Sequence, residues 1–112
     1  MRRVAAIALL LLAASCGGSD EVSRDVGARC DTNDECAGRC LSGGDYPGGF
    51  CTIACDSDAD CTGGSVCVDV EGGVCLFPCN AAGDCTFLGN GWSCMDETAH
   101  PSNEPVKACL GG

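Results

Sequence analysis

The residues of this chain with the most capacity for chemistry are its cysteines. There are thirteen in 112 residues: twelve follow residue 29 in a regular pattern, and Cys16 stands alone after an apolar run. A cysteine can bind a metal, act as a nucleophile, carry a lipid or form a disulfide. The chain has no C-x-x-C and no C-x-C pair, which argues against a thiolate metal site. Its cysteine content exceeds the roughly 8–10% that is typical of short secreted disulfide scaffolds, so we expect disulfides and an oxidising compartment.

The twelve regularly spaced cysteines form three copies of one unit. Each unit reads cysteine, five residues, cysteine, a short loop, cysteine, a longer loop, cysteine. The five-residue spacer begins with Asp or Asn and ends with an acid in every copy. Such a repeat predicts tandem modules. Their expected boundaries are 30–54, 55–78 and 79–112.

The elements that position these cysteines are short. We expect each module to be a capped turn followed by a small β-hairpin, in a small disulfide-rich fold with little other regular secondary structure. In the second module, Ser65–Val70 alternates in polarity, Glu71-Gly72 predicts a turn, and Gly73–Phe77 predicts the returning strand. Met95–Ala108 is expected to be a long loop. The residues after the first cysteine are expected to cap the turns through their side chains: Asp31, Asp56 and Asn80.

The pairing of the cysteines is constrained but not fixed by the spacing. Four cysteines allow three pairings. If the five-residue spacer is helical, its two cysteines lie about 9 Å apart, beyond the roughly 7 Å that a disulfide spans. First-to-third with second-to-fourth is preferred, and first-to-fourth with second-to-third stays open. The preferred pairs are Cys30–Cys40, Cys36–Cys51, Cys55–Cys67, Cys61–Cys75, Cys79–Cys94 and Cys85–Cys109.

The supply of apolar side chains for a core is small. The chain has only five aromatic residues, and it has seventeen glycines. A unit of this size cannot stabilise itself by burial alone, so we expect two disulfides per module, at roughly 2–4 kcal/mol each, to replace a core. Few contacts between modules are then expected, which predicts an elongated rod.

The N-terminus has the order of a secretory signal. A positive start, MRR, precedes the apolar run Val4–Ala14 and a small-residue boundary, which predicts a signal peptide over 1–15. The apolar run would span about 16 Å as a helix, too short for a bilayer core of about 30 Å. Plain secretion with cleavage near Ser15 is one interpretation, but it leaves Cys16 as an odd thirteenth cysteine.

The segment Leu12-Ala13-Ala14-Ser15-Cys16 resembles the lipobox of bacterial lipoproteins, with Ala13 where Leu is usual. The resemblance implies cleavage before Cys16, a diacylglyceryl group on its thiol and further acylation such as palmitate. The protein would then be a membrane-anchored cell-envelope lipoprotein at the outer membrane or cell surface. Residues 16–29 carry no cysteine pattern and are expected to form a flexible, lipidated tether.

The stretch CDSDADC, residues 55–61, followed by a Gly-rich loop and a cysteine, resembles small modules of the Dickkopf N-terminal type and of the EB type. It is also similar to whey-acidic-protein modules, but their adjacent cysteines are absent here, so the inhibitor function of that family does not transfer. What the likeness implies is an extracellular binding or spacer module without catalysis.

Calcium is the metal that the acidic spacers could suit. Asp56, Asp58 and Asp60 have the D-x-D-x-D opening of an EF-hand loop, but Cys61 replaces its glycine and Cys67 replaces its bidentate glutamate. The EF-hand interpretation is rejected. A weak calcium site on the three aspartates stays open beside the simpler interpretation of a solvated acidic turn, and no cofactor is expected.

Catalysis has little to build on in this sequence. His100 is the single histidine, in a loop between prolines, and no G-x-S-x-G motif occurs. We therefore expect no enzyme. The net charge of −10 disfavours nucleic acid.

The expected function is non-enzymatic: a membrane-anchored module that binds protein or glycan or has a structural role. The alternative is a secreted inhibitor-like or ligand-like protein that acts through an exposed loop. Aromatic side chains on loops are the candidate contact residues, and these are Tyr46, Phe87 and Trp92.

Overall fold

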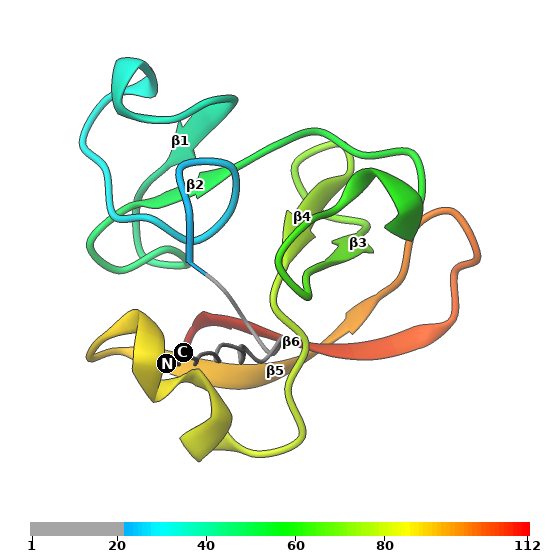
Figure 1. Cartoon of the computed structure of the whole chain (residues 1–112). Helices are drawn as coiled ribbons and strands as arrows, with labels where there is room; N and C mark the ends of the chain where they lie inside the picture. The colour runs from blue at the N-terminus through cyan, green and yellow to red at the C-terminus, as the bar shows by residue number, and fades with distance from the viewer. Residues whose placement is uncertain (1–21) are drawn as a thin grey trace, which may run out of the picture.

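Each repeat of the sequence folds into a short 3₁₀ turn followed by an antiparallel hairpin, in a computed structural model that describes residues 22–112 (Figure 1). The predicted signal peptide, Cys16 and the first part of the predicted tether lie outside the described residues. The elements are η1 (Asn33–Glu35), β1 (Arg39–Leu41), β2 (Phe50–Thr52), η2 (Asp58–Asp60), β3 (Val66–Val68), β4 (Val74–Leu76), η3 (Ala82–Leu88), β5 (Trp92–Thr98) and β6 (Pro105–Gly111).

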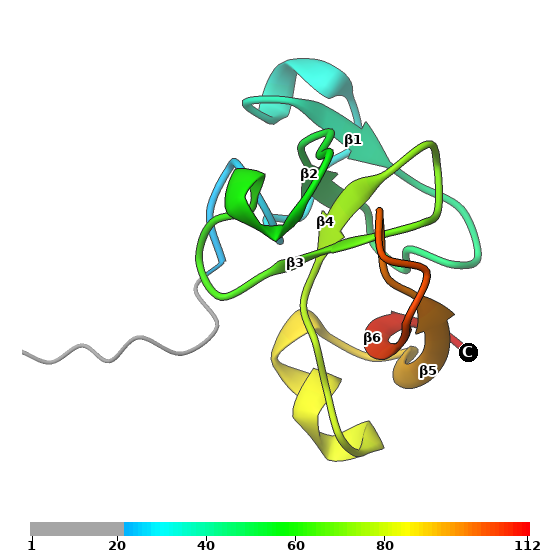
Figure 2. The same cartoon turned by 90° about the vertical axis from the view of Figure 1, so that its right-hand side faces the viewer.

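The modular fold class predicted from the repeats is confirmed. The strands pair as β1 with β2, β3 with β4, and β5 with β6, and each pair forms its own two-stranded sheet. In the view of Figure 2, the hairpin of the second module lies between the hairpins of the first and third modules. No helix in residues 22–112 is both long enough and apolar enough to cross a membrane.

The hairpins explain how the cysteines pair. In each hairpin the third cysteine of the module lies directly opposite the fourth, as Cys40 does opposite Cys51. Opposite residues of an antiparallel pair point to the same face of the sheet, so both sulfurs project toward the 3₁₀ turn. The disulfides therefore join first to third and second to fourth, which is the pairing that the spacing favoured: Cys30–Cys40, Cys36–Cys51, Cys55–Cys67, Cys61–Cys75, Cys79–Cys94 and Cys85–Cys109.

The turns are capped by the acid at the end of each spacer. Glu35 Oε1 accepts the backbone N–H groups of Asp31 and Thr32, at 2.5 and 3.2 Å. The same contact recurs in the other modules, from the amides of Asp56 to Asp60 and of Asn80 and Ala81 to Asp84. The expectation that Asp31, Asp56 and Asn80 cap through their side chains is wrong. A carboxylate three or four residues along reaches back to the N–H groups that the turn leaves unpaired.

These caps have an electrostatic consequence. The backbone N–H groups that they accept hold the pKa of Glu35 and of Asp84 below the ordinary carboxyl range. The charged form of each acid is therefore part of the folded structure.

The stretch before the first module is folded in its second half. Val26 is fully buried, and the backbone N–H of Gly27 donates to Cys51 O at 2.8 Å. Residues 22–29 thus differ from the flexible tether predicted over 16–29. Their sequence is polar and lies outside the repeat, so it carries no local sign of this pairing with the first module.

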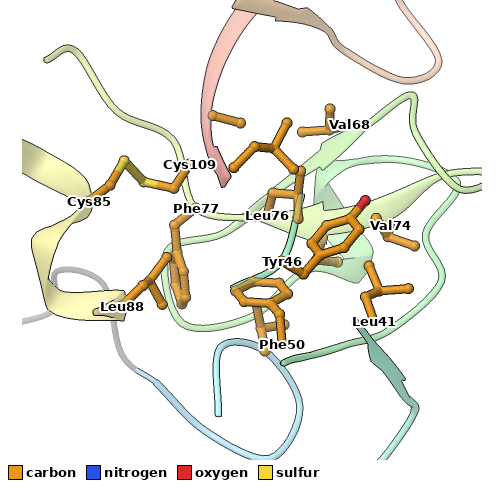
Figure 3. Packing of buried hydrophobic residues seen from close by; sticks show 14 of the residues in the cluster. Leu41, Tyr46, Phe50, Val68, Val74, Leu76, Phe77, Cys85, Leu88 and Cys109 are labelled. Carbon is orange, nitrogen blue, oxygen red and sulfur yellow. A yellow bond between two sulfur atoms is a disulfide. The ribbon is translucent and has the colours of Figure 1, made fainter. Parts of the chain in front are cut away.

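One aromatic cluster joins the three modules. Phe50 is fully buried, and its ring centroid lies 6.5 Å from that of Tyr46, 6.2 Å from that of Phe77 and 5.3 Å from that of Trp92 (Figure 3). Tyr46 and Phe50 come from the first module, Phe77 from the second and Trp92 from the third. The expected rod with few contacts between modules is therefore wrong, because the few aromatic residues of the chain gather in one place.

Hydrogen bonds cross the module boundaries beside this cluster. The buried Thr52 hydroxyl donates to Cys75 O at 2.6 Å, between the first and second modules. Trp92 Nε1 donates to Pro47 O at 3.0 Å, between the third and first modules. Buried polar groups are costly unless they are paired, so these bonds help to fix how the modules pack.

The third hairpin is longer than the sequence suggested. Most of Met95–Ala108, expected to be a loop, is strand, and Met95 lies opposite Ala108 in the register. Isolated bridges from Val68 to Ala99 and from Pro78 to Ala108 join this hairpin to the second module. The long stretch of polar residues at the exposed end of the hairpin conceals its strands in the sequence.

Candidate functional site

Two of the three predicted contact residues belong to the core. Tyr46 is 4% exposed and Trp92 is 6% exposed, so neither is displayed on a loop as expected. The reason is scarcity: with so few aromatic rings, the core uses them. Phe87 is 42% exposed and keeps a large free face. Its ring also packs edge-on against Phe77, with centroids 5.2 Å apart.

A groove lies where residues from all three modules meet. Its volume is about 330 Å³. The first module contributes Asp45 and the edge of Tyr46, and the second contributes Glu71. The third contributes Glu97 and Met95, whose side chain is 37% exposed. The complete lining is Asp45, Tyr46, Val70, Glu71, Met95, Glu97, Leu110 and Gly111.

Glu71 organises the polar side of this groove. The Tyr46 hydroxyl donates to Glu71 Oε2 at 3.2 Å. Arg39 Nη2 donates to the Glu71 backbone oxygen at 3.0 Å and lies 3.8 Å from its Oε1. The backbone of Glu71 has φ +53°, in the left-handed region. These contacts hold a non-glycine residue at the tip of the second hairpin, where it meets the first module.

The groove is electrically negative. Burial raises the pKa of Tyr46 well above its usual range, and the neighbouring Glu71 carboxylate raises it further. Tyr46 is therefore a neutral hydrogen-bond donor at physiological pH. Three carboxylates line the groove, at Asp45, Glu71 and Glu97, with the apolar Met95 beside them. A ligand group that carries positive charge and an apolar stem fits this chemistry.

The calcium candidates are engaged in the architecture of the second module. Asp60 accepts the backbone N–H of Asp56 at 2.8 Å, and Asp58 Oδ1 accepts that of Cys67 at 2.8 Å. Within residues 22–112, the groups of three whose ligand atoms converge are made of cysteines alone. The structure thus does not bring Asp56, Asp58 and Asp60 together as one ligand set.

The converging sulfurs are a consequence of the paired disulfides. In each module the first, second and fourth cysteines have Sγ atoms within 4.8 Å of one another, as Cys30, Cys36 and Cys51 do. The second and fourth are bonded to each other, and the first is bonded to the third. Sulfurs in disulfides are not thiolates, and a metal site here would require reduction first.

His100 lies at the junction of the second and third modules. Its backbone N–H donates to Cys67 O at 3.1 Å, and its Nδ1 is 3.9 Å from Asp69 Oδ1. The side chain is 31% exposed. These contacts join the turn of the third hairpin to the second module.

The residues of the groove that sequence reasoning missed are Glu71, Glu97 and Met95. Glu71 was interpreted only as part of a turn, and the other two were placed in a loop. Their meeting depends on how the modules pack, and no spacing in the sequence reports that. Comparison of the chain with protein-family models, curated proteins and solved structures finds no match. The chain is a small cysteine-rich domain with six disulfides in three groups.

Proposed function

We propose that this chain is an exported, lipid-anchored envelope protein whose folded domain binds a partner without catalysing a reaction. The observation that carries the proposal is the cysteine count. The sequence has thirteen cysteines, and the six disulfides use all twelve that follow residue 29. Cys16 has no partner among them. Six disulfides indicate an oxidising, extracellular type of environment.

The position of Cys16 supports a lipid on its thiol. It follows an apolar segment with a positive start and the lipobox-like residues Leu12 to Ser15. Acylation would give the leftover cysteine a use and would hold the domain at a membrane. Each buried CH₂ contributes about 0.8 kcal/mol, so two or three acyl chains give lasting attachment.

The groove between the modules is the surface that best supports a binding role. It is lined by side chains that lie far apart in the sequence, and its Asp45, Glu71 and Glu97 carboxylates face an apolar Met95. We assign it to a protein or glycan partner in the envelope that presents basic groups. The net charge of −10 opposes a nucleic acid partner.

The anchor is tested with Cys16→Ser in the producing cell, with Ser15→Ala as the matched control because it keeps the thiol and a small residue at the boundary. Metabolic labelling with a fatty acid should mark the wild type and the control but not Cys16→Ser. The label remaining on Cys16→Ser, or absent from the wild type, would overturn the lipid anchor.

The partner is tested by cross-linking on whole cells. Neutralising two groove acids, with Asp45→Asn and Glu97→Gln, should reduce the yield of the cross-linked partner. Glu104→Gln is the control, since Glu104 is exposed and is not part of the groove. Equal yields from all variants would exclude the groove as the contact. Capture of a soluble protease instead of an envelope component would favour an inhibitor-like role.

A further inference from the structure

Three large hydrophobic side chains of residues 22–112 are exposed, and two of them lie on one ring. Val22 is 49% exposed, Phe87 is 42% exposed and Met95 is 37% exposed. Met95 belongs to the groove between the modules. Val22 and Phe87 both lie against Phe77, which is itself fully buried.

The contact of Val22 with Phe77 passes over Gly27. A Cβ built on Gly27 would lie 2.7 Å from Phe77 Cε2 and 3.3 Å from Val22 Cγ2, and Gly27 has φ +104°. The glycine therefore lets the N-terminal segment close over the ring. On its other side, Phe77 meets Phe87 edge-on at 5.2 Å. Val22 and Phe87 thus form a continuous apolar surface over Phe77, which we call the Val22–Phe87 patch.

A hydrogen bond fixes the two sides of this patch to each other. Arg29 Nη1 donates to the backbone oxygen of Leu88 at 3.2 Å. This bond joins the N-terminal segment to the end of η3, where Phe87 is located. The two exposed side chains are therefore held by the fold and not by chance proximity.

The patch lies next to the anchor in the chain. Val22 follows Cys16 by six residues, and residues 22–29 are folded onto the domain. A fully extended chain spans at most about 3.4 Å per residue, so Val22 stands within roughly 20 Å of a lipid on Cys16. The whole predicted tether over 16–29 would have allowed more than twice that reach. The side of the domain that carries Val22 must then face the membrane.

We propose that the Val22–Phe87 patch contacts the bilayer interface and sets the orientation of the domain on the membrane. The inference rests on the proposed lipid anchor at Cys16. Two apolar side chains next to an acyl anchor can enter the boundary between headgroups and acyl chains. The contact needs no anionic lipid, because the patch is apolar and the chain is strongly acidic. The lipid supplies attachment, and the patch supplies direction.

The test uses the full lipidated protein in phosphatidylcholine vesicles whose acyl chains carry bromine, which quenches tryptophan on contact. Phe87→Trp and Val22→Trp place reporters in the patch, and Met95→Trp is the matched control at the third exposed hydrophobic position. The native Trp92 is buried and gives a constant background. Interfacial residues lie about 5–10 Å deep, so we expect the two patch reporters to lose roughly half of their added emission. The control should lose little.

Flotation of the vesicles, measured on the same samples, separates the two proposals. Protein that floats with quenched patch reporters and an unquenched control supports the inference. Protein that floats with no quenching at either patch position, or with equal quenching at Met95→Trp, overturns the patch and leaves the anchor intact. Protein that does not float overturns the anchor and the patch together. Thermal melts of each variant in solution show that its fold is kept.

Discussion

Replacing Phe50 with alanine should destabilise all three modules at once. The ring is fully buried and contacts aromatic rings from each of the three modules: Tyr46, Phe77 and Trp92. A buried Phe→Ala change costs about 3–5 kcal/mol, and each aromatic pair adds roughly 0.5–1.5 kcal/mol. We therefore expect Phe50→Ala to lower the free energy of unfolding by about 4 kcal/mol. For a domain of this size, that is a fall in Tm of roughly 15–30 °C.

The assay is thermal and denaturant unfolding with the disulfides intact. It is followed by circular dichroism and by the fluorescence of Trp92, whose ring lies 5.3 Å from that of Phe50. Both signals should shift together, because the modules share the core. Phe87→Ala is the control, since that ring is 42% exposed and should cost much less in solution. A shift of only a few degrees, or Trp92 emission that unfolds independently of Phe50→Ala, would refute the shared core and restore the rod.

Three further predictions concern the acids. Glu35 and Asp84 have a lower pKa folded than unfolded, so their contribution to stability is present at neutral pH and is lost as the pH falls below roughly 4; Tm should fall on acidification, and less steeply with Glu35→Gln and Asp84→Asn. Glu71→Gln should lower the pKa of Tyr46, the single tyrosine, while burial keeps it raised; tyrosinate absorbance in alkali should begin at lower pH than in the wild type. Asp58→Ala should cost about 1 kcal/mol in denaturant unfolding by removing a hydrogen-bond acceptor, and Asp58→Asn should keep most of it.

Each of these has an outcome that would contradict it. An acid response that is unchanged in the Glu35 and Asp84 variants would place the pH dependence on other groups. Tyrosinate that forms at the same pH in Glu71→Gln would deny the carboxylate its effect on Tyr46. A rise in the Tm of the wild type with millimolar calcium, lost in both Asp58 variants, would mean that the aspartates bind a metal after all.

The hairpins and the disulfide pattern were predictable because they are local and repeated. Glu71-Gly72 marks a turn, and alternation on both sides of it marks the strands. Three agreeing copies of the spacing removed most of the ambiguity. The opposite placement of Cys67 and Cys75 across the hairpin then accounts for the pairing.

The shared core was not predictable because its contacts are non-local. The sequence shows Tyr46, Phe50, Phe77 and Trp92 as scattered single residues, and composition alone suggested that no large core forms. A count of aromatic residues does not say whether they meet. The same limit hid the groove, whose Asp45 and Glu97 lie on different modules.

The caps illustrate a smaller limit. Asp31 and Glu35 are both good capping residues by type, and the sequence does not say which of them turns toward the backbone. In the structure Glu35 accepts two N–H groups, one of them from Asp31 itself. The fold decides because the carboxylate at the end of the spacer reaches more unpaired donors than the one at its start.

The most direct test of the central claim is an intact mass of the protein extracted from its native membrane, with alkylation before and after reduction. The account predicts a chain that begins at Cys16 with the added mass of acyl groups. It predicts no alkylation before reduction and alkylation of the twelve disulfide cysteines after it. A mass without lipid, or thiols that react before reduction, would contradict it.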